Sequence, residues 1–213
     1  MINSIKIIVP ILFLSILFGG CEDNRKKYWK NGNLQSELKY KDNKLNGIAI
    51  WYYENGIKEQ EVYYTNNVLN GPLTRWYRNG ILETKSYYKD GILEGLALMY
   101  DYNGNLVSEE NYKNDTLVSN YTQWYPTGQV KIKGSYQNGY YTGRWLYYNV
   151  TGEIIGTGNY VKGCGLQKAW HPNGNIMREI NYFHNLKHGA EKWYNPDGQL
   201  EKVIYYDEGI IVE

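Results

Sequence analysis

Two histidines of this 213-residue chain, His184 and His188, lie four residues apart, a spacing that could serve metal chemistry. On a helix, residues at this spacing share a face, so both imidazoles could reach one Zn²⁺ ion. Equivalent positions elsewhere in the chain hold the turn-forming residues Asp42 and Asp90, and no third ligand of the same kind is close in the sequence. We therefore expect both histidines to be solvated turn residues, and we expect no metal site and no cofactor.

Catalytic chemistry has few other candidates. Glu109 and Glu110 form a carboxylate pair, but adjacent residues of a strand point to opposite faces and cannot act on one substrate. Cys164 lies in the segment VKGCG without a general base of recognisable spacing. The chain contains no G-x-S-x-G motif, and its glycines do not form a phosphate-binding loop before a helix. We therefore expect that the protein is not an enzyme.

The N-terminus predicts a covalent modification. Lys6 precedes an apolar run over residues 7–18, which is too short to span a bilayer as a helix and matches a signal peptide. Cys21 directly follows two glycines and resembles the bacterial lipobox, although Phe18 stands where that pattern prefers leucine. We expect residues 1–20 to be a lipoprotein signal peptide and Cys21 to carry a lipid anchor. The protein would then lie at the bacterial cell envelope, periplasmic or on the surface; an ordinary secretory signal is the alternative.

The composition of the chain narrows the remaining classes of function and partner. Without residues 1–20, which contain one lysine and no acid, the chain has 22 basic and 22 acidic residues. This balance argues against nucleic acid as a partner. Two cysteines exclude a disulfide scaffold. The 24 tyrosines suit half-buried surfaces, because tyrosine combines apolar area with a polar tip.

An internal repeat organises the chain from residue 28 to residue 213. Position −4 from a recurring glycine is aromatic in all eight repeats, position +8 is always Tyr, and position +2 is aliphatic in seven of eight. Short aromatic runs between N-G, D-G and T-G dipeptides predict β-hairpins. The glycines recur every 24 residues with one interval of 22, at Gly32, Gly56, Gly80, Gly104, Gly128, Gly152, Gly174 and Gly198.

Proline sharpens the prediction for the turn at these glycines. Pro126, Pro172 and Pro196 stand two residues before the glycine, where a two-residue type I′ turn would need a positive φ that proline cannot adopt. A three-residue loop with the glycine in a G1 bulge accepts proline. Such a loop pairs position −4 with +2, and we expect −4, +2 and +8 to share one face.

The unit resembles the MORN repeat in its bacterial variant form, as in residues 40–58, YKDNKLNGIAIWYYENGIK. The resemblance implies an all-β fold: an elongated single-layer antiparallel meander of about eight stacked hairpins over residues 28–213. Residues 21–27 would be a polar stalk. Related bacterial proteins are described as antitoxin-like (YwqK-type), and other arrays as membrane-associated or protein-binding scaffolds.

The face opposite position −4 carries the candidate partner-binding residues. Aromatic residues and one arginine cluster there in the first half of the chain: Trp51, Tyr53, Tyr63, Arg75, Tyr77 and Tyr87. Exposed Trp, Tyr and Arg are common anchors of interfaces, although a single-layer sheet also needs cover on both faces. We expect a lipid-anchored scaffold that binds a partner protein, with an antitoxin or immunity role as a special case. Binding of a glycan or cell-wall polymer through aromatic rows is the alternative.

Overall fold

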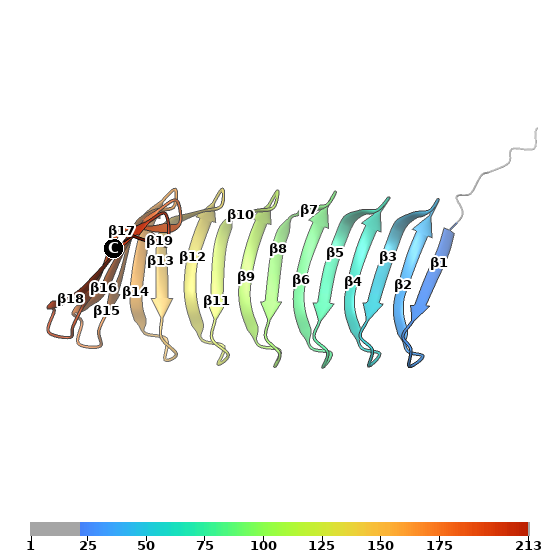
Figure 1. The fold of residues 1–213 in the computed structure, drawn as a ribbon, viewed down its shortest axis with the longest axis horizontal. Helices are drawn as coiled ribbons and strands as arrows, with labels where there is room; N and C mark the ends of the chain where they lie inside the picture. Colours follow the sequence, from blue (N-terminus) through green and yellow to red (C-terminus); the bar gives the residue numbers. More distant parts are fainter. Residues whose placement is uncertain (1–21, 213) are drawn as a thin grey trace, which may run out of the picture.

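The computed structural model describes residues 22–212, which form one open antiparallel sheet of 19 strands without a helix (Figure 1). Each strand pairs with the next along the chain, except that the two-residue strand β7 and the following β8 both pair with β6, and β10 and the following β11 both pair with β9. This confirms the all-β meander of stacked hairpins.

The first strands are β1 (Glu22–Tyr28), β2 (Leu34–Lys41), β3 (Lys44–Tyr52), β4 (Lys58–Thr65), β5 (Val68–Trp76), β6 (Leu82–Lys89), β7 (Ile92–Leu93), β8 (Gly95–Tyr100), β9 (Leu106–Lys113) and β10 (Thr116–Leu117). The others are β11 (Ser119–Trp124), β12 (Val130–Gln137), β13 (Tyr140–Tyr148), β14 (Ile154–Val161), β15 (Cys164–Trp170), β16 (Ile176–Phe183), β17 (Leu186–Tyr194), β18 (Leu200–Asp207) and β19 (Ile210–Ile211).

The recurring glycines lie in three-residue loops along the lower rim of the sheet, as predicted (Figure 1). In the second repeat the Tyr53 N–H donates to the Ile57 carbonyl at 2.8 Å, and the Gly56 N–H donates to the Tyr53 carbonyl at 2.9 Å. Gly56 has φ +85°, the left-handed conformation that a G1 bulge requires. This geometry explains why proline is accepted two residues earlier.

The upper rim consists of two-residue turns whose residues both have positive φ, as at Asp42 (+50°) and Asn43 (+61°). These turns also link each repeat to the next. The Asn67 N–H donates to the Leu45 carbonyl at 2.9 Å, and the Asn67 Oδ1 accepts from the Leu45 N–H at 2.7 Å. The upper rim is therefore joined by hydrogen bonds as well as by the strands below it.

The expectation that positions −4, +2 and +8 share a face is wrong for +8. Tyr52 pairs with Lys58 as expected, but Trp51 pairs with Gln60, which leaves Glu59 unpaired in a second bulge. The extra residue reverses the alternation of side chains, because their period in a strand is two. Position +8 therefore lies on the face of Trp51 and Gln60, opposite Tyr52.

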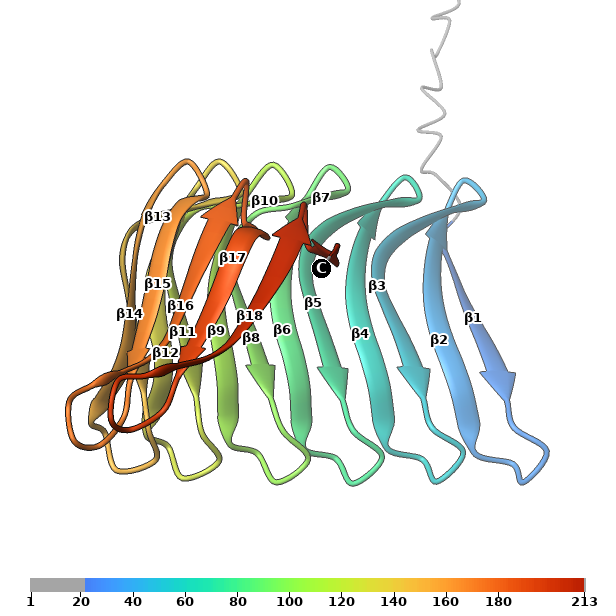
Figure 2. The same cartoon turned by 60° about the vertical axis from the view of Figure 1, so that its left-hand side comes forward.

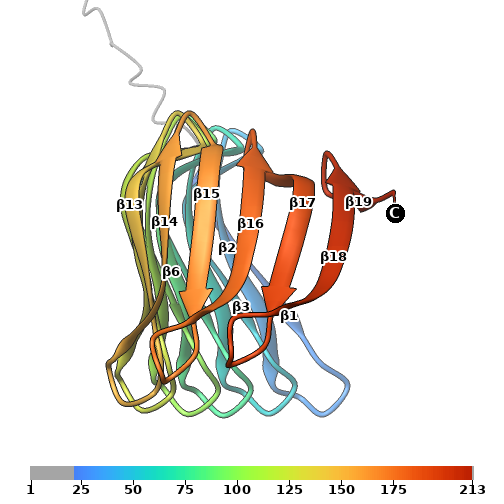
Figure 3. The same ribbon diagram turned by 90° about the vertical axis from the view of Figure 1, so that its left-hand side faces the viewer.

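The face that carries the +8 tyrosines is concave in the second half of the sheet. The rings of Tyr141 on β13 and Tyr182 on β16 lie 6.3 Å apart, although two strands separate their own. Figures 2 and 3 show the same bend, with β15–β18 turned away from the plane of β1–β12. We name this the concave face and the opposite one the convex face. Trp145 and Tyr160 on the concave face are each only 3% exposed and form the aromatic core of the bend.

The side chain of Asn185 stabilises the bend at the upper rim through two hydrogen bonds. Its side-chain oxygen accepts from the Tyr141 N–H at 2.8 Å, and its side-chain nitrogen donates to the Gly139 carbonyl at 2.7 Å. These partners belong to a turn two hairpins earlier in the chain. The contact therefore draws nonadjacent turns together on the side toward which the sheet curls.

The N-terminal end of the described chain differs from one expectation. Residues 22–28, which overlap the expected polar stalk, form β1 and pair with β2 from Glu22↔Lys41 to Tyr28↔Leu34. The charged residues of β1 suit a strand at the edge of a sheet, where charge discourages further pairing. Cys21 and the predicted signal peptide lie outside the described residues. Between residues 22 and 212, no helix has the length and apolarity needed to cross a membrane.

Candidate functional site

The two histidines lie at the upper rim. His184, with φ +48°, is the first residue of the turn that Asn185 completes, and its ring lies 4.0 Å from that of Phe183. His188 places Nδ1 3.3 Å from the Asp207 carboxylate. Within residues 22–212 the structure contains no group of three or more His, Cys, Asp or Glu residues that could hold a metal ion.

The paired glutamates lie on opposite faces. Glu109 pairs with Leu98 on the convex face, whereas Glu110 lies on the concave face and accepts a 2.6 Å hydrogen bond from the Tyr112 hydroxyl. Burial, and then this hydrogen bond, raise the pKa of Tyr112. Cys164 Sγ contacts the Lys162 carbonyl within its own turn, at 3.7 Å. These residues do not assemble into one site.

The six candidate partner-binding residues divide between the two faces. Trp51 and Arg75 are linked through Gln60 in one cross-strand row of the concave face. Tyr63 and Tyr87 lie on the convex face, because they pair with Ile48 and Pro72. They therefore cannot contribute to the same surface as Trp51.

Tyr53 and Tyr77, at the lower rim of the concave face, have a structural role. The Tyr53 hydroxyl donates to the Trp76 carbonyl at 2.8 Å, and the Tyr77 hydroxyl donates to the Tyr100 carbonyl at 2.8 Å. Each bond joins one repeat to the next. Their rings add aromatic surface near Trp51 and Arg75, but their hydroxyls are already engaged.

A groove of about 280 Å³ opens on the concave face over β4–β9. We name it the central groove. Its lining includes Leu73, Ser86 and Ala97 from one cross-strand row, Tyr88 and Tyr112 from the row above, and Gln60, Arg75, Thr84 and Met99 from the row below. It combines two aromatic side chains with one guanidinium and several neutral hydrogen-bonding groups.

The groove exists because the first half of the concave face carries small side chains. The row that contains Ala49, Val62 and Ala97 continues in the second half to Trp145 and Ile180, which fill the bend. Over Ser86 and Ala97 no large side chain fills the space above the sheet, and this leaves the central groove. The residue types at positions −4, +2 and +8 could not reveal this groove, because they predicted the wrong face for the +8 tyrosines.

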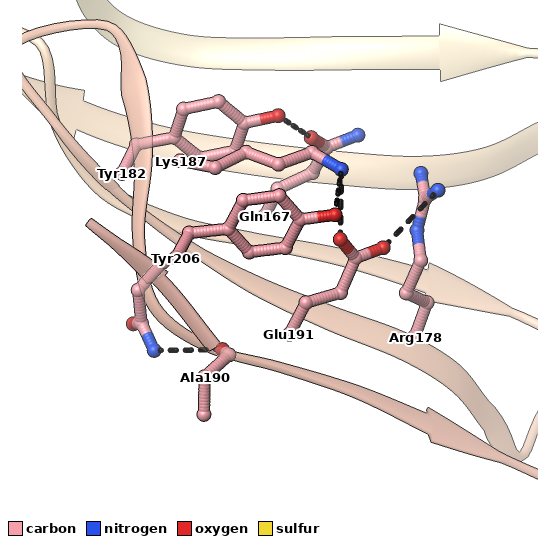
Figure 4. Close-up of polar contacts among 8 residues, drawn as sticks. Gln167, Arg178, Tyr182, Lys187, Ala190, Glu191 and Tyr206 are labelled. Carbon is pink, nitrogen blue, oxygen red and sulfur yellow. Dashed lines mark hydrogen bonds and ion pairs between the residues drawn. The ribbon is translucent and has the colours of Figure 1, made fainter. Parts of the chain in front are cut away.

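A buried polar cluster lies at the other end of the concave face (Figure 4). Glu191 is only 2% exposed; its carboxylate lies 2.7 Å from the Lys187 Nζ and 3.8 Å from Arg178. Burial lowers the pKa of Lys187, but hydrogen bonds to Glu191 and Tyr206 outweigh burial, so the pKa is raised overall. The cluster neutralises a carboxylate that would otherwise be very unfavourable there. Its main effect is to join β16, β17 and β18.

Comparison with known proteins identifies the repeat. The family described as MORN repeat variant matches seven segments that together make up more than half of the chain: residues 24–42, 45–66, 69–90, 93–114, 118–138, 164–184 and 187–208. The stretch between the fifth and sixth segments has the same hairpin geometry, formed by β13 and β14. None of the curated proteins matches the chain.

Proposed function

The chain belongs to the MORN repeat variant family, and from that premise we propose that it is a non-enzymatic scaffold whose concave face binds a partner protein. The central groove carries this proposal. It is bordered by Arg75 and Met99, with Trp51 two strands from Arg75 in the same row. Tryptophan, arginine and methionine are enriched in protein interfaces. Met99 is 46% exposed, so its flexible apolar side chain is accessible to a partner at the border of the groove.

The proposed place of action is the bacterial cell envelope. The motif at Cys21 supports it, because a lipid chain on this cysteine would hold the array at a membrane surface. The central groove opens over β4–β9 and is not lined by β1 (Figure 1), so a partner bound there would leave the anchored end of the sheet uncovered. An antitoxin or immunity role would be one form of this function, with a toxin as the partner.

Photocrosslinking from two positions of one strand tests which face of the sheet binds the partner. Met99 and Leu96 lie on the same strand, β8, and are both 46% exposed, but they point to the concave and convex faces. A photoactivatable amino acid at position 99 is expected to capture one defined protein in intact cells, and the same amino acid at position 96 is expected not to capture it. Capture of the same protein at both positions, or at neither, would reject the concave face as the binding surface.

A second candidate function, binding of a glycan or cell-wall polymer, is supported by the aromatic row of the convex face. Position −4 places one aromatic residue there in every hairpin, and all of them except the exposed Tyr28 are half-buried, as at Tyr52, Trp76 and Trp124. Successive rings are two strands apart, or about 9.5 Å, which is close to the disaccharide repeat of a β-1,4-linked chain. Pull-down with peptidoglycan distinguishes the two functions. Binding that Trp124→Ala weakens and Trp51→Ala leaves intact would favour the polysaccharide.

A further inference from the structure

We propose that a cavity at the lower rim, between the loops at residues 149–153 and 171–175, binds an aromatic ring with a hydrogen-bond donor, supplied as a tyrosine side chain of another polypeptide. We name it the rim cavity. It has a volume of about 570 Å³, and its lining includes Asn149, Ile154, Ile155, Trp170, Pro172 and Met177. It shares no residue with the central groove, so it is a second binding site beyond the proposed function.

At most other repeat junctions an aromatic ring of the chain itself occupies the equivalent place. Tyr53 stands three residues before the turn glycine, and its hydroxyl donates to the Trp76 carbonyl of the next repeat at 2.8 Å. Four further junctions are closed in the same way by a ring hydroxyl or ring nitrogen, from Trp29, Tyr77, Tyr125 and His171. The array itself therefore shows which kind of group fits between two lower loops.

The junction at the rim cavity has no such ring. Asn149 occupies the position of Tyr53, and its short side chain donates within its own loop to Glu153, at 2.7 Å. The acceptor equivalent to the Trp76 carbonyl is the carbonyl of Trp170, and no side chain of residues 22–212 donates to it. A ring position without a ring thus lies beside a carbonyl without a side-chain donor.

The lining of the rim cavity corresponds to the surroundings of the Tyr53 ring. The Arg78 guanidinium lies 5.3 Å from the centre of that ring. Burial and the nearby carboxylates of Glu59 and Glu83 raise the pKa of Tyr53. At the positions of Glu59, Arg78 and Glu83, the sixth and seventh repeats carry Ile155, Pro172 and Met177, and all three line the rim cavity. Apolar groups thus replace charged ones around the ring position, which favours burial of an aromatic ring.

The surface around the rim cavity favours a tyrosine within a polypeptide over a free phenol. Three apolar side chains of the same segment are exposed: Val150 by 59%, Ile154 by 49% and Ile155 by 39%. Apolar side chains exposed together mark interaction sites more often than single ones do. A polypeptide would place its tyrosine ring in the cavity and cover these neighbours with its adjoining residues, whereas a free phenol would leave them in contact with water.

The test uses the full chain and the blocked tripeptide acetyl-Gly-Tyr-Gly-amide as the probe, with binding followed by ligand-observed NMR. A Kd on the order of 1 mM is expected for a ligand of this size. Asn149→Tyr is expected to weaken binding about tenfold or more, because two rings cannot occupy one cavity. The matched control, Asp101→Tyr, adds the same ring at the other junction that lacks one, and should change binding less than about twofold.

The substitution at position 149 is expected to be compatible with folding, because Tyr53 shows that the repeat accepts tyrosine there. Thermal denaturation checks this, with an unchanged or raised midpoint as the expected result. Asn149→His, which copies His171, is the second variant and should also weaken binding of the tripeptide.

Two further ligands test the donor and the source of the ring. Acetyl-Gly-Phe-Gly-amide is expected to bind on the order of fivefold more weakly, since it offers the Trp170 carbonyl no hydroxyl. p-Cresol, a free phenol, is also expected to bind more weakly than the tyrosine tripeptide. Binding of p-cresol at least as tight as that of the tripeptide would reject the polypeptide as the source.

Three other outcomes would overturn the inference: the tyrosine tripeptide shows no binding up to about 10 mM, Asn149→Tyr and Asp101→Tyr weaken it equally, or the phenylalanine tripeptide binds as tightly. Their meaning is separable from failure of the proposed function, because photocrosslinking from Met99 reports on the central groove and leaves the lower rim unaltered.

Discussion

The Tyr53 hydroxyl donates a hydrogen bond to the backbone carbonyl of Trp76, 2.8 Å away and 23 residues further along the chain. Trp29, Tyr77 and Tyr125 make the equivalent contact to the following repeat. His171 supplies a ring nitrogen at the same position, 2.8 Å from the Tyr194 carbonyl. An array of hairpins is stabilised largely by contacts between neighbours, so these hydrogen bonds set the coupling between repeats.

We predict that Tyr53→Phe destabilises the array by about 1 kcal/mol, because the half-buried Trp76 carbonyl loses its side-chain partner. Urea denaturation followed by circular dichroism measures the shift. Tyr102→Phe is the control, since Tyr102 is 55% exposed. An equal effect of the two substitutions would show that the contact contributes nothing beyond loss of a surface hydroxyl.

Two repeat junctions lack this contact at the lower rim, and we predict faster hydrogen exchange there. Asp101 and Asn149 occupy the position of Tyr53 but bond within their own loops, to Asn105 and Glu153. The amides of Trp124 and Trp170, in the repeats that follow, should exchange faster than that of Trp76. Exchange measured by mass spectrometry on peptides from each lower loop checks this. Uniform protection along the lower rim would contradict it.

Removing Glu191 should be among the most destabilising single changes. Glu191→Ala leaves Lys187 and Arg178 beside a buried cavity without their carboxylate, and a loss of about 3 kcal/mol is expected. The double variant Glu191→Leu/Lys187→Met replaces both charges by apolar groups and should recover much of that loss. Thermal denaturation of the wild type, of Glu191→Ala and of the double variant measures these differences in stability. If the double variant does not recover stability, the Glu191 carboxylate is needed to compensate the charge of Arg178 and not that of Lys187.

Acid should weaken the second half of the sheet through Glu179. The Lys168 ammonium, 2.9 Å away, is the main cause that holds the pKa of Glu179 below its ordinary value of 4.5. A lowered pKa in the folded state contributes stability that is present above pH 4.5 and is lost as pH falls through the folded-state value. Glu179→Gln should therefore reduce the drop in unfolding midpoint between neutral pH and about pH 3.

Glu201→Gln provides the comparison for this pH dependence, because Glu201 is an exposed glutamate of the same sheet. Denaturation midpoints measured at several pH values test the pair. The same residual pH dependence in Glu179→Gln and Glu201→Gln would rule out a specific role for the ion pair between Lys168 and Glu179.

The sequence by itself determined the repeat and its lower turn. The 24-residue spacing predicted stacked hairpins, and Pro126, Pro172 and Pro196 excluded a two-residue turn, because proline cannot take a positive φ. The resulting pairing of Tyr52 with Lys58 is confirmed. Trp51 and Arg75 were also placed correctly on the face opposite Tyr52.

Only the tertiary structure decided what lies beside Trp51 and Arg75. One unpaired residue, Glu59, moves Tyr64 to the face of Trp51, and no column of residue types marks that bulge, since both faces are rich in tyrosine. The central groove follows from this shift and from the small side chains of Ser86 and Ala97. The bend depends on contacts between distant turns, such as Asn185 with Gly139. A period-two pattern describes neighbours along a strand, whereas a bulge and a bend change which residues meet across many strands.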